Sequence, residues 1–312
     1  MMNNKKVSII GSGMVGSNIA YSMMLKNLVD EIVLIDINEK LVQGEILDIK
    51  HGFSNFGYSN IYSGDYSDIK DSDLIIITAG RSRKPNETRL DMVIDNVKIS
   101  KLISQEINKY YNGGLIIVVS NPVDIITYKM SEYLNLNKNL IFGTGCILDT
   151  SRFIFSISDY IRCKTSDVDG MIIGEHGDSQ VAVWSQTKIK NVYINDYCQL
   201  NDIKWTDEEK VKLEKDVSKM GAAIIEKKGK THYGIATSVC YLADIILNNK
   251  EEKVCISKCL NGEYGISDVA LSLPFILNEN GIKKVMNEKL NENEMLRLKS
   301  SSEKLKEVLN KI

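Results

Sequence analysis

Residues 6–16 read KVSIIGSGMVG, a β-branched run followed at once by three glycines in the pattern G-x-G-x-x-G. The run predicts a strand, and residues 14–26 have the apolar spacing of a helix. In such a strand–turn–helix, Gly11 permits the tight turn, Gly13 lets the backbone approach a pyrophosphate, and Gly16 lets the helix pack on the strand. The helix N-terminus favours the anion. The stretch therefore predicts a dinucleotide-binding loop.

A carboxylate at the end of the second predicted strand, Ile32–Ile35, indicates which dinucleotide binds. Asp36 lies about 20 residues beyond the last glycine of the loop. It can accept both ribose hydroxyls of an adenosine and repel a 2′-phosphate, and Ile37 and Asn38 follow it rather than a basic residue. The sequence therefore favours NAD over NADP.

The first 143 residues alternate apolar runs with amphipathic stretches. Leu74–Thr78, Leu115–Ser120 and a short run ending at Phe142 predict strands covered on both faces. Glu39–His51 and Glu87–Tyr111 predict helices between the strands. This alternation predicts a doubly wound parallel sheet of the Rossmann type, with right-handed crossovers.

The pattern changes near residue 143, so we predict a Rossmann NAD-binding domain over residues 1–143 and an α+β substrate domain over residues 144–312. Two short strand-like runs bracket His176, and Thr206 with Glu209 predicts a capping-box helix start. The helix that starts there is predicted to run to about Lys228, and further helices are predicted over Leu148–Tyr160, over Tyr233–Asn248 and in the last 20 residues. Two strand-like runs, Val254–Leu260 and Val269–Leu273, predict a hairpin.

The 312-residue chain has 43% apolar and 26% charged residues and a formal net charge of −2. This balance gives no reason to expect nucleic acid or an anionic membrane as partner. No apolar run approaches the roughly 20 residues that a membrane span needs, and the short basic N-terminus leads us to expect no secretory signal. The six cysteines lack CxxC spacing and there are three histidines, so we expect no metal site and reduced thiols in a cytoplasmic protein.

Histidine is the side chain whose proton moves near neutral pH, and His176 follows an apolar run within Gly174–Ser179, GEHGDS. Taken alone, this position is typical of a structural histidine as well as of a general acid or base. Asp149 and Arg152 share one face of a predicted helix, either as a surface ion pair or as a partner for His176 and a clamp for a substrate carboxylate. The basic loop Gly80–Asn86 is either solvated or a lid over an anion.

Six motifs together resemble the lactate and malate dehydrogenase superfamily over the whole length of the chain. They are Gly11–Gly16, Ile77–Gly80, Lys84–Pro85 with Glu87–Arg89, Ser120–Asp124, Leu148–Arg152 and Gly174–Ser179. Glu175 before the histidine and Glu87-Thr88-Arg89 in the loop resemble the L-lactate dehydrogenase branch. The resemblance implies an NAD-dependent oxidoreductase that interconverts an (S)-2-hydroxy acid and its 2-oxo acid, with L-lactate and pyruvate as the leading pair.

The resemblance implies three catalytic residues. His176 exchanges the hydroxyl proton, Asp149 orients its ring and raises its pKa, and Arg89 polarises the substrate carbonyl. It also implies a homotetramer or a dimer.

The remaining contacts follow from the same resemblance. The residues implied to bind substrate are Arg152, Arg83, Asn121 and Thr231. The residues implied to bind the cofactor are Gly11, Gly13, Met14, Val15, Gly16, Asp36, Tyr66, Thr78, Ala79, Gly80 and Asn121.

The chain departs from the lactate branch in its basic loop. Arg83 stands where lactate dehydrogenases usually carry glutamine and where malate dehydrogenases carry an arginine for the second carboxylate of oxaloacetate. Glu87 in the same loop could partly neutralise Arg83, and Arg81 replaces a residue that is usually small. Malate and oxaloacetate are therefore the alternative substrate pair.

A second departure concerns regulation. Bacterial relatives that bind fructose 1,6-bisphosphate use an arginine and a histidine where this chain has Ile154 and Asp169. An apolar residue and an anion cannot serve a bisphosphate, so we predict no activation by that sugar. Two further alternatives are a non-catalytic NAD-binding protein that reuses the fold and a dehydrogenase for bulkier 2-hydroxy acids.

Overall fold

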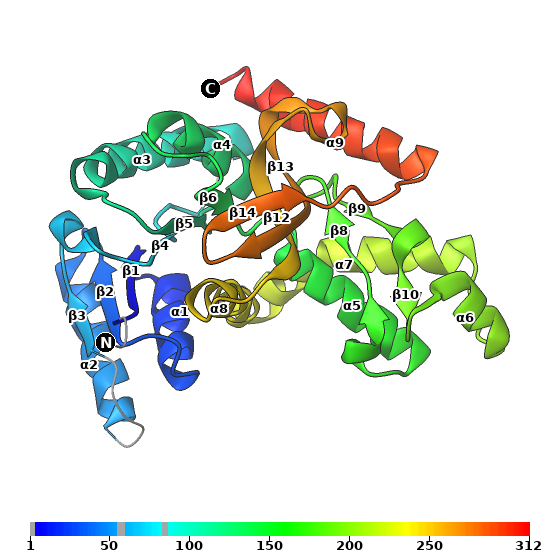
Figure 1. The fold of residues 1–312 in the computed structure, drawn as a ribbon, viewed down its shortest axis with the longest axis horizontal. Helices are drawn as coiled ribbons and strands as arrows, with labels where there is room; N and C mark the ends of the chain where they lie inside the picture. Colours follow the sequence, from blue (N-terminus) through cyan, green and yellow to red (C-terminus); the bar gives the residue numbers. More distant parts are fainter. Residues whose placement is uncertain (1–3, 55–59, 83–86) are drawn as a thin grey trace.

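The computed structural model describes residues 4–54, 60–82 and 87–312. In the first half of the chain, strands and helices alternate as predicted (Figure 1). The elements are β1 (Lys6–Ile10), α1 (Met14–Leu25), β2 (Glu31–Ile35), α2 (Glu39–Phe53), β3 (Asn60–Ser63), a 3₁₀ turn (Tyr66–Ile69), β4 (Leu74–Ile77), α3 (Arg89–Tyr110), β5 (Leu115–Val118), α4 (Val123–Tyr133) and β6 (Ile141–Gly143).

Six parallel strands lie in the order β3-β2-β1-β4-β5-β6, which confirms the doubly wound Rossmann sheet. Helices α1 and α2 lie on one face together with α8, and α3 and α4 lie on the other (Figure 1). Because both faces are covered, every residue of β4 and β5 is buried. The short strand β3 and helix α4 were not predicted from the sequence.

The second half combines helices with short strands. Its elements are α5 (Ile147–Ile161), β7 (Val168–Asp169), β8 (Ile172–Ile173), β9 (Val181–Ala182), β10 (Lys188–Ile189), β11 (Val192–Tyr193), α6 (Ile194–Leu200), α7 (Asp207–Lys228), α8 (Tyr233–Leu247), β12 (Glu252–Asn261), β13 (Ser267–Asn278), β14 (Gly281–Val285) and α9 (Glu292–Leu309). Two small antiparallel sheets form here, β11-β10-β7 and β8-β9. This is the α+β character that the sequence predicted.

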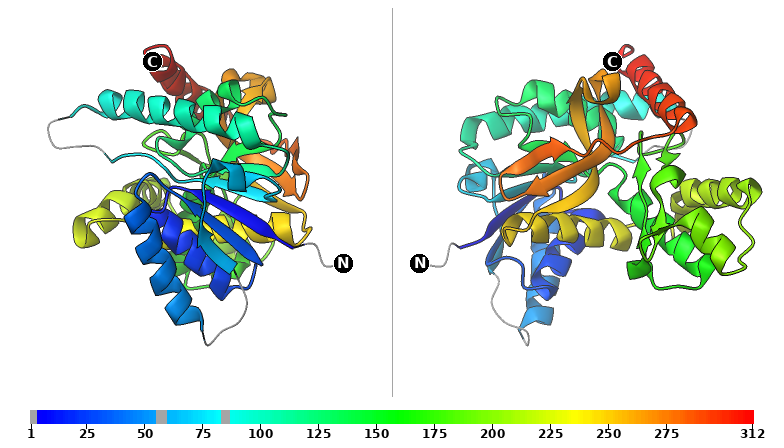
Figure 2. Two further views of the ribbon diagram at one scale, coloured as in Figure 1. Left: turned by 90° about the vertical axis from the view of Figure 1, so that its left-hand side faces the viewer. Right: turned by 45° about the vertical axis from the view of Figure 1, so that its right-hand side comes forward.

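The predicted hairpin of the second half joins the sheet of the first half. Strand β12 pairs antiparallel with β6, at Ser257 and Gly143, so β12, β13 and β14 extend the parallel sheet to nine strands. Helix α9 packs against β13 (Figures 1 and 2). The two halves are therefore joined by strand pairing between β6 and β12.

Two helix starts differ in detail from the prediction. Helix α3 begins at Arg89 rather than Glu87, because Thr88 and Asp91 form a reciprocal capping box. The predicted capping box at Thr206 is one-sided. The Thr206 hydroxyl accepts from the Glu209 amide at 3.4 Å, whereas the Glu209 carboxylate pairs with Lys204 at 2.9 Å.

The described ranges contain no helix that is both long and apolar enough to cross a membrane. All six cysteines are free thiols, of which Cys163 and Cys259 are half-buried and the others are buried.

Candidate active site

The loop between β1 and α1 has the geometry that a pyrophosphate needs. Gly11 has φ +105°, and a Cβ on it would lie 2.5 Å from the Ala79 amide nitrogen. A Cβ on Gly16 would lie 1.9 Å from the Gly11 carbonyl oxygen, so neither glycine can carry a side chain. A Cβ on Gly13 would meet nothing within 4 Å. The second glycine thus borders open space at the N-terminus of α1, where Met14 and Val15 follow.

The ends of β2 and β4 support this loop. The Asp36 carboxylate accepts the Ser12 amide at 2.7 Å and the Asn38 amide at 2.9 Å, which fixes it at the rim of the loop. The Thr78 hydroxyl donates to the Gly11 carbonyl at 2.7 Å, and Ala79 and Gly80 continue from β4 beside it.

Tyr66 begins the 3₁₀ turn that follows the carboxyl end of β3. Burial, with the charges of Glu106 and Asp36, raises the pKa of Tyr66 to about 12, so this phenol is neutral at pH 7. A neutral phenol near Asp36 suits the predicted adenosine end of a dinucleotide.

The structure brings His176, Asp149 and Arg152 together. Asp149 and Arg152 lie one turn apart on α5, and His176 lies in the loop between β8 and β9. The Asp149 carboxylate contacts His176 Nδ1 at 2.5 Å with one oxygen and accepts from Arg152 Nη1 at 3.0 Å with the other. The alternative of a surface ion pair is therefore wrong, because Asp149 is only 2% exposed.

Electrostatics tune this group for proton exchange. Burial alone would lower the pKa of His176, but the charge and hydrogen bond of Asp149 outweigh it and raise the pKa above its ordinary value. Burial would raise the pKa of Asp149, but His176 and Arg152 together hold it below its usual range. Asp149 is therefore ionised at neutral pH, where His176 can gain or lose a proton.

The other two histidines lack this environment. His51 is exposed near the end of α2, and no carboxylate partner is found for it among the described residues. His232 is buried against Tyr233, and burial together with Lys228 lowers its pKa. The described part of the chain holds no group of three or more His, Cys, Asp or Glu side chains that could bind a metal.

The remaining predicted site residues lie around this centre or outside the description. Asn121 is exposed at the end of β5, after which comes a cis peptide bond to Pro122. Thr231 is half-buried in the segment between α7 and α8. The backbone of Arg89 opens α3, and Arg83 lies outside the described residues.

Arg81 makes contacts that the sequence did not predict. Its guanidinium pairs with both oxygens of Glu87 and donates to Asp95 Oδ2 at 2.7 Å. The expected partial neutralisation of Arg83 by Glu87 concerns a side chain outside the described residues and stays a prediction. The unusual Arg81 ties both stems of the basic loop to α3.

Three contacts of this region were not predicted. Buried Asn96 on α3 accepts the Arg81 amide at 2.9 Å and donates to the Asn121 carbonyl at 2.7 Å.

A Cβ on Gly221 of α7 would lie 3.5 Å from Arg152 Nη2, so a small residue leaves room for that guanidinium. Asp124 accepts the main-chain amide of His176 at 2.8 Å. Its place in the motif Ser120–Asp124 was the available signal.

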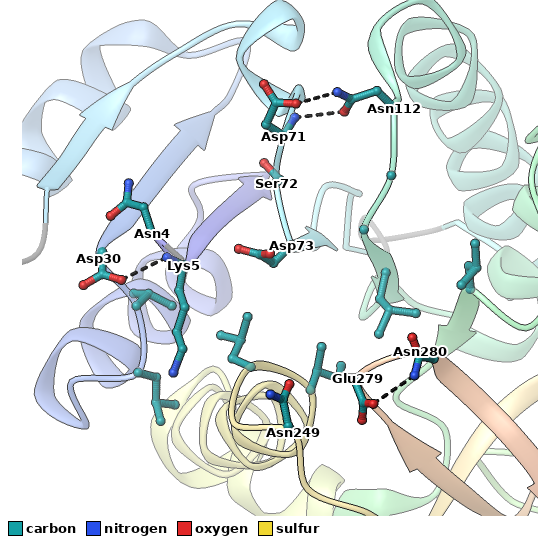
Figure 3. Close-up of a pocket in the computed structure, with 18 of the residues that line it drawn as sticks. Asn4, Lys5, Asp30, Asp71, Ser72, Asp73, Asn112, Asn249, Glu279 and Asn280 are labelled. Carbon is teal, nitrogen blue, oxygen red and sulfur yellow. Dashed lines mark hydrogen bonds between the residues drawn. The ribbon is translucent and has the colours of Figure 1, made fainter. Parts of the chain in front are cut away.

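A cavity of about 990 Å³ lies at the opposite edge of the sheet (Figure 3). It is bordered by Asp30 and Asp73, which precede β2 and β4, and by Asp71, which exchanges two hydrogen bonds with Asn112. Ligands of doubly wound sheets bind at the carboxyl ends of the strands, where the glycine loop, Asp36 and Thr78 lie. The cavity is therefore not the candidate active site, despite its size.

Comparison with known proteins identifies the family of this chain. The family model for the NAD-binding domain of lactate/malate dehydrogenases matches residues 5–143, and the model for their α/β C-terminal domain matches residues 146–312. The chain belongs to the lactate/malate dehydrogenase family. Like other members of that family, it binds NAD, and the open space at Gly13 with Asp36 on the rim fits this cofactor.

Individual members of the family match over the whole chain. L-lactate dehydrogenase of Acetivibrio thermocellus is 41% identical, covering 99% of this chain and 98% of the relative. L-lactate dehydrogenase 1 of Clostridium acetobutylicum is 39% identical over the full length of both. The crystal structure of minor L-lactate dehydrogenase from Enterococcus mundtii with bound ligands superimposes with a TM-score of 0.96, at 36% identity and 99% coverage of each chain.

Proposed function

We propose that this chain is an enzyme that interconverts L-lactate and pyruvate with NAD. The observation that carries the proposal is the contact of one buried carboxylate, Asp149, with both His176 and Arg152. This arrangement supplies a proton carrier and a carboxylate-binding cation side by side, which are the two groups that a 2-hydroxy acid requires. The relatives described above are L-lactate dehydrogenases, which supports the choice of substrate pair.

His176 carries the proton in this mechanism. Its Nδ1 is engaged by Asp149, so Nε2 is the nitrogen that takes the hydroxyl proton during oxidation and returns it during reduction. Asp149 holds the ring in this orientation and stabilises the imidazolium. NAD held at the glycine loop would supply the hydride acceptor for C2 of lactate, and its reduced form would supply the hydride for pyruvate.

Arg152 binds the substrate carboxylate. The Arg152 side chain is 11% exposed, and Asp149 accepts from one of its nitrogens, Nη1. The remaining N–H groups of the guanidinium can donate to a substrate carboxylate. The family motifs support three further assignments. Arg89 polarises the carbonyl, Asn121 contacts the substrate oxygen and the cofactor, and Thr231 lines the pocket.

The cofactor site belongs to the same proposal. We assign residues 1–143 to NAD binding and residues 144–312 to substrate binding, supported by the two family models that match residues 5–143 and 146–312. The proposed cofactor contacts are Gly11, Gly13, Met14, Val15, Gly16, Asp36, Tyr66, Thr78, Ala79, Gly80 and Asn121.

The test is oxidation of NADH by pyruvate, followed by absorbance, with His176→Ala as the control. Wild-type turnover that falls by at least about 10³-fold in the variant, with NADH binding intact, supports the proposal. NADH binding without turnover of pyruvate or any other 2-oxo acid would instead identify a non-catalytic member of the family.

Oxaloacetate is the second candidate substrate, on the strength of Arg83 in the sequence. A cation facing the substrate side chain would pair with a second carboxylate. The decisive comparison is kcat/KM for pyruvate and oxaloacetate in wild type and Arg83→Gln. An unchanged ratio would show that Arg83 does not select the substrate.

Assembly, regulation and location complete the proposal. We propose a homotetramer or dimer, supported by the exposed apolar side chains Leu25 and Leu47 on α1 and α2, and light scattering would measure it. We propose no activation by fructose 1,6-bisphosphate, since Ile154 is half-buried against the core and Asp169 pairs with Lys253 at 3.6 Å. A fall in KM for pyruvate on adding that sugar would contradict this.

A cytoplasmic location suits six free thiols.

A further inference from the structure

A second buried carboxylate lies beneath the catalytic histidine. Asp124 belongs to the first turn of α4 and is 3% exposed. Its Oδ2 accepts the main-chain amide of His176 at 2.8 Å, whereas Asp149 contacts the ring. The histidine is therefore held at two points, and by two carboxylates from different helices, α4 and α5.

The other oxygen of Asp124 faces an unsatisfied polar site. Asp124 Oδ1, Thr127 Oγ1 and Ser257 Oγ are buried and have no hydrogen-bond partner within the described part of the chain. Thr127 and Ser257 both lie beside Gly143, where β6 pairs with β12, since a Cβ on Gly143 would lie 2.3 Å from Thr127 Oγ1 and 3.3 Å from Ser257 Cβ. The Ser257 hydroxyl in turn lies close enough to Asp124 to favour ionisation of that carboxylate.

Buried polar groups are normally satisfied, and a buried water needs two to four polar partners. The three orphaned oxygens supply that number at one place. A water there can donate to Asp124 Oδ1 and accept from a hydroxyl, which leaves no polar group unpaired around the carboxylate.

The charge of Asp124 also acts on the imidazole. Burial raises the pKa of Asp124 to about 6, with His176 favouring its ionised form and Glu175 opposing it. In return, the Asp124 charge adds to that of Asp149 in raising the pKa of His176, against the charge of Arg152. Cys146 is a further titratable group that senses Asp124, and it stays a neutral thiol because burial raises its pKa.

We propose that Asp124 is a positioning residue for the reaction, which fixes the main chain of His176, supports its imidazolium by charge, and shares one buried water with Thr127 and Ser257. The inference rests on the proposed function, since it assigns Asp124 to the same proton transfer. If Asp124 served only for packing, removing its charge would not change the pH midpoint of pyruvate reduction, whereas the role proposed for it predicts that the midpoint moves.

The test uses Asp124→Asn and Asp124→Ala in the full-length enzyme. Asparagine keeps an acceptor oxygen for the His176 amide and removes the charge. We expect it to move the pH midpoint of pyruvate reduction down by about one unit while kcat on the acidic plateau stays within about twofold. Alanine removes the anchor as well, and we expect kcat to fall by about tenfold while KM for pyruvate changes little.

The outcomes separate this inference from the proposed function. NADH binding and wild-type turnover of pyruvate are measured first, and their failure would refute the function rather than the role of Asp124. An unchanged midpoint in Asp124→Asn overturns the charge role, even if Asp124→Ala does not fold. A crystal structure with no ordered water between Asp124, Thr127 and Ser257 overturns the water site.

Discussion

Asp149→Asn removes the charge of the catalytic aspartate and keeps its shape. The carboxylate contacts His176 Nδ1 at 2.5 Å and Arg152 Nη1 at 3.0 Å, and it is 2% exposed, so little water can replace it. Asparagine can still accept one hydrogen bond at this position. The substitution therefore isolates the electrostatic part of the interaction with the imidazolium.

The size of the effect follows from this geometry. Opposite unit charges about 4 Å apart attract by roughly 4 kcal/mol at an effective dielectric constant of about 20. The hydrogen bond that asparagine retains offsets part of this loss, so we expect the imidazolium to lose about 3 kcal/mol of stabilisation. That corresponds to a fall of about 10²-fold in kcat/KM for pyruvate and of about two units in the pKa of His176.

The assay is kcat/KM for pyruvate across pH, together with NADH affinity. The matched control is Asp159→Asn, which removes an exposed carboxylate from the same helix α5. We expect the control to behave as wild type in both measurements. A fall of less than about threefold in Asp149→Asn, or an unmoved pH midpoint, would refute the electrostatic reasoning.

Three other predictions follow from the same geometry. Because Asp149 raises the pKa of His176, pyruvate reduction should decline as pH rises through a midpoint above about 6.5, whereas lactate oxidation should increase; pH profiles that run in the same direction would contradict this. Gly16→Ala should lower Tm, because the new Cβ would lie 1.9 Å from a carbonyl oxygen. Gly13→Ala should leave Tm unchanged and weaken NADH binding by at least about tenfold. Equal Tm values for the two variants would count against the packing argument. Arg81→Ala and Glu87→Gln should be non-additive in a double-mutant cycle of urea unfolding, and additive effects would show that their ion pair adds no stability.

Much of the first half could be predicted from local sequence. The strand Lys6–Ile10, the loop at Gly11–Gly16 and the buried runs that became β4 and β5 all formed where expected. Apolar periodicity and glycine chemistry act within a few residues, so the sequence carries these signals directly. The four-residue strand β3 was missed because its sequence, Asn-Ile-Tyr-Ser, contains no apolar run long enough to predict a strand.

Contacts between distant segments could not be predicted in the same way. The family resemblance implied that His176 and Asp149 are partners, but only the fold places a second carboxylate, Asp124, on the amide of the same residue. The attachment of β12 to β6 was also absent from any local pattern, because strand pairing depends on which edge is free in the folded sheet.

The sequence by itself determined the fold class, because apolar periodicity and the glycine loop act within a few residues, and its motifs indicated the chemistry through a family resemblance. Only the tertiary structure decided which charges meet. Arg81 pairs with Glu87 on the far side of the basic loop and with Asp95 on α3, two contacts that no local pattern indicated. Ion pairs form between the side chains that the folded backbone brings within about 4 Å, and sequence separation does not determine that distance.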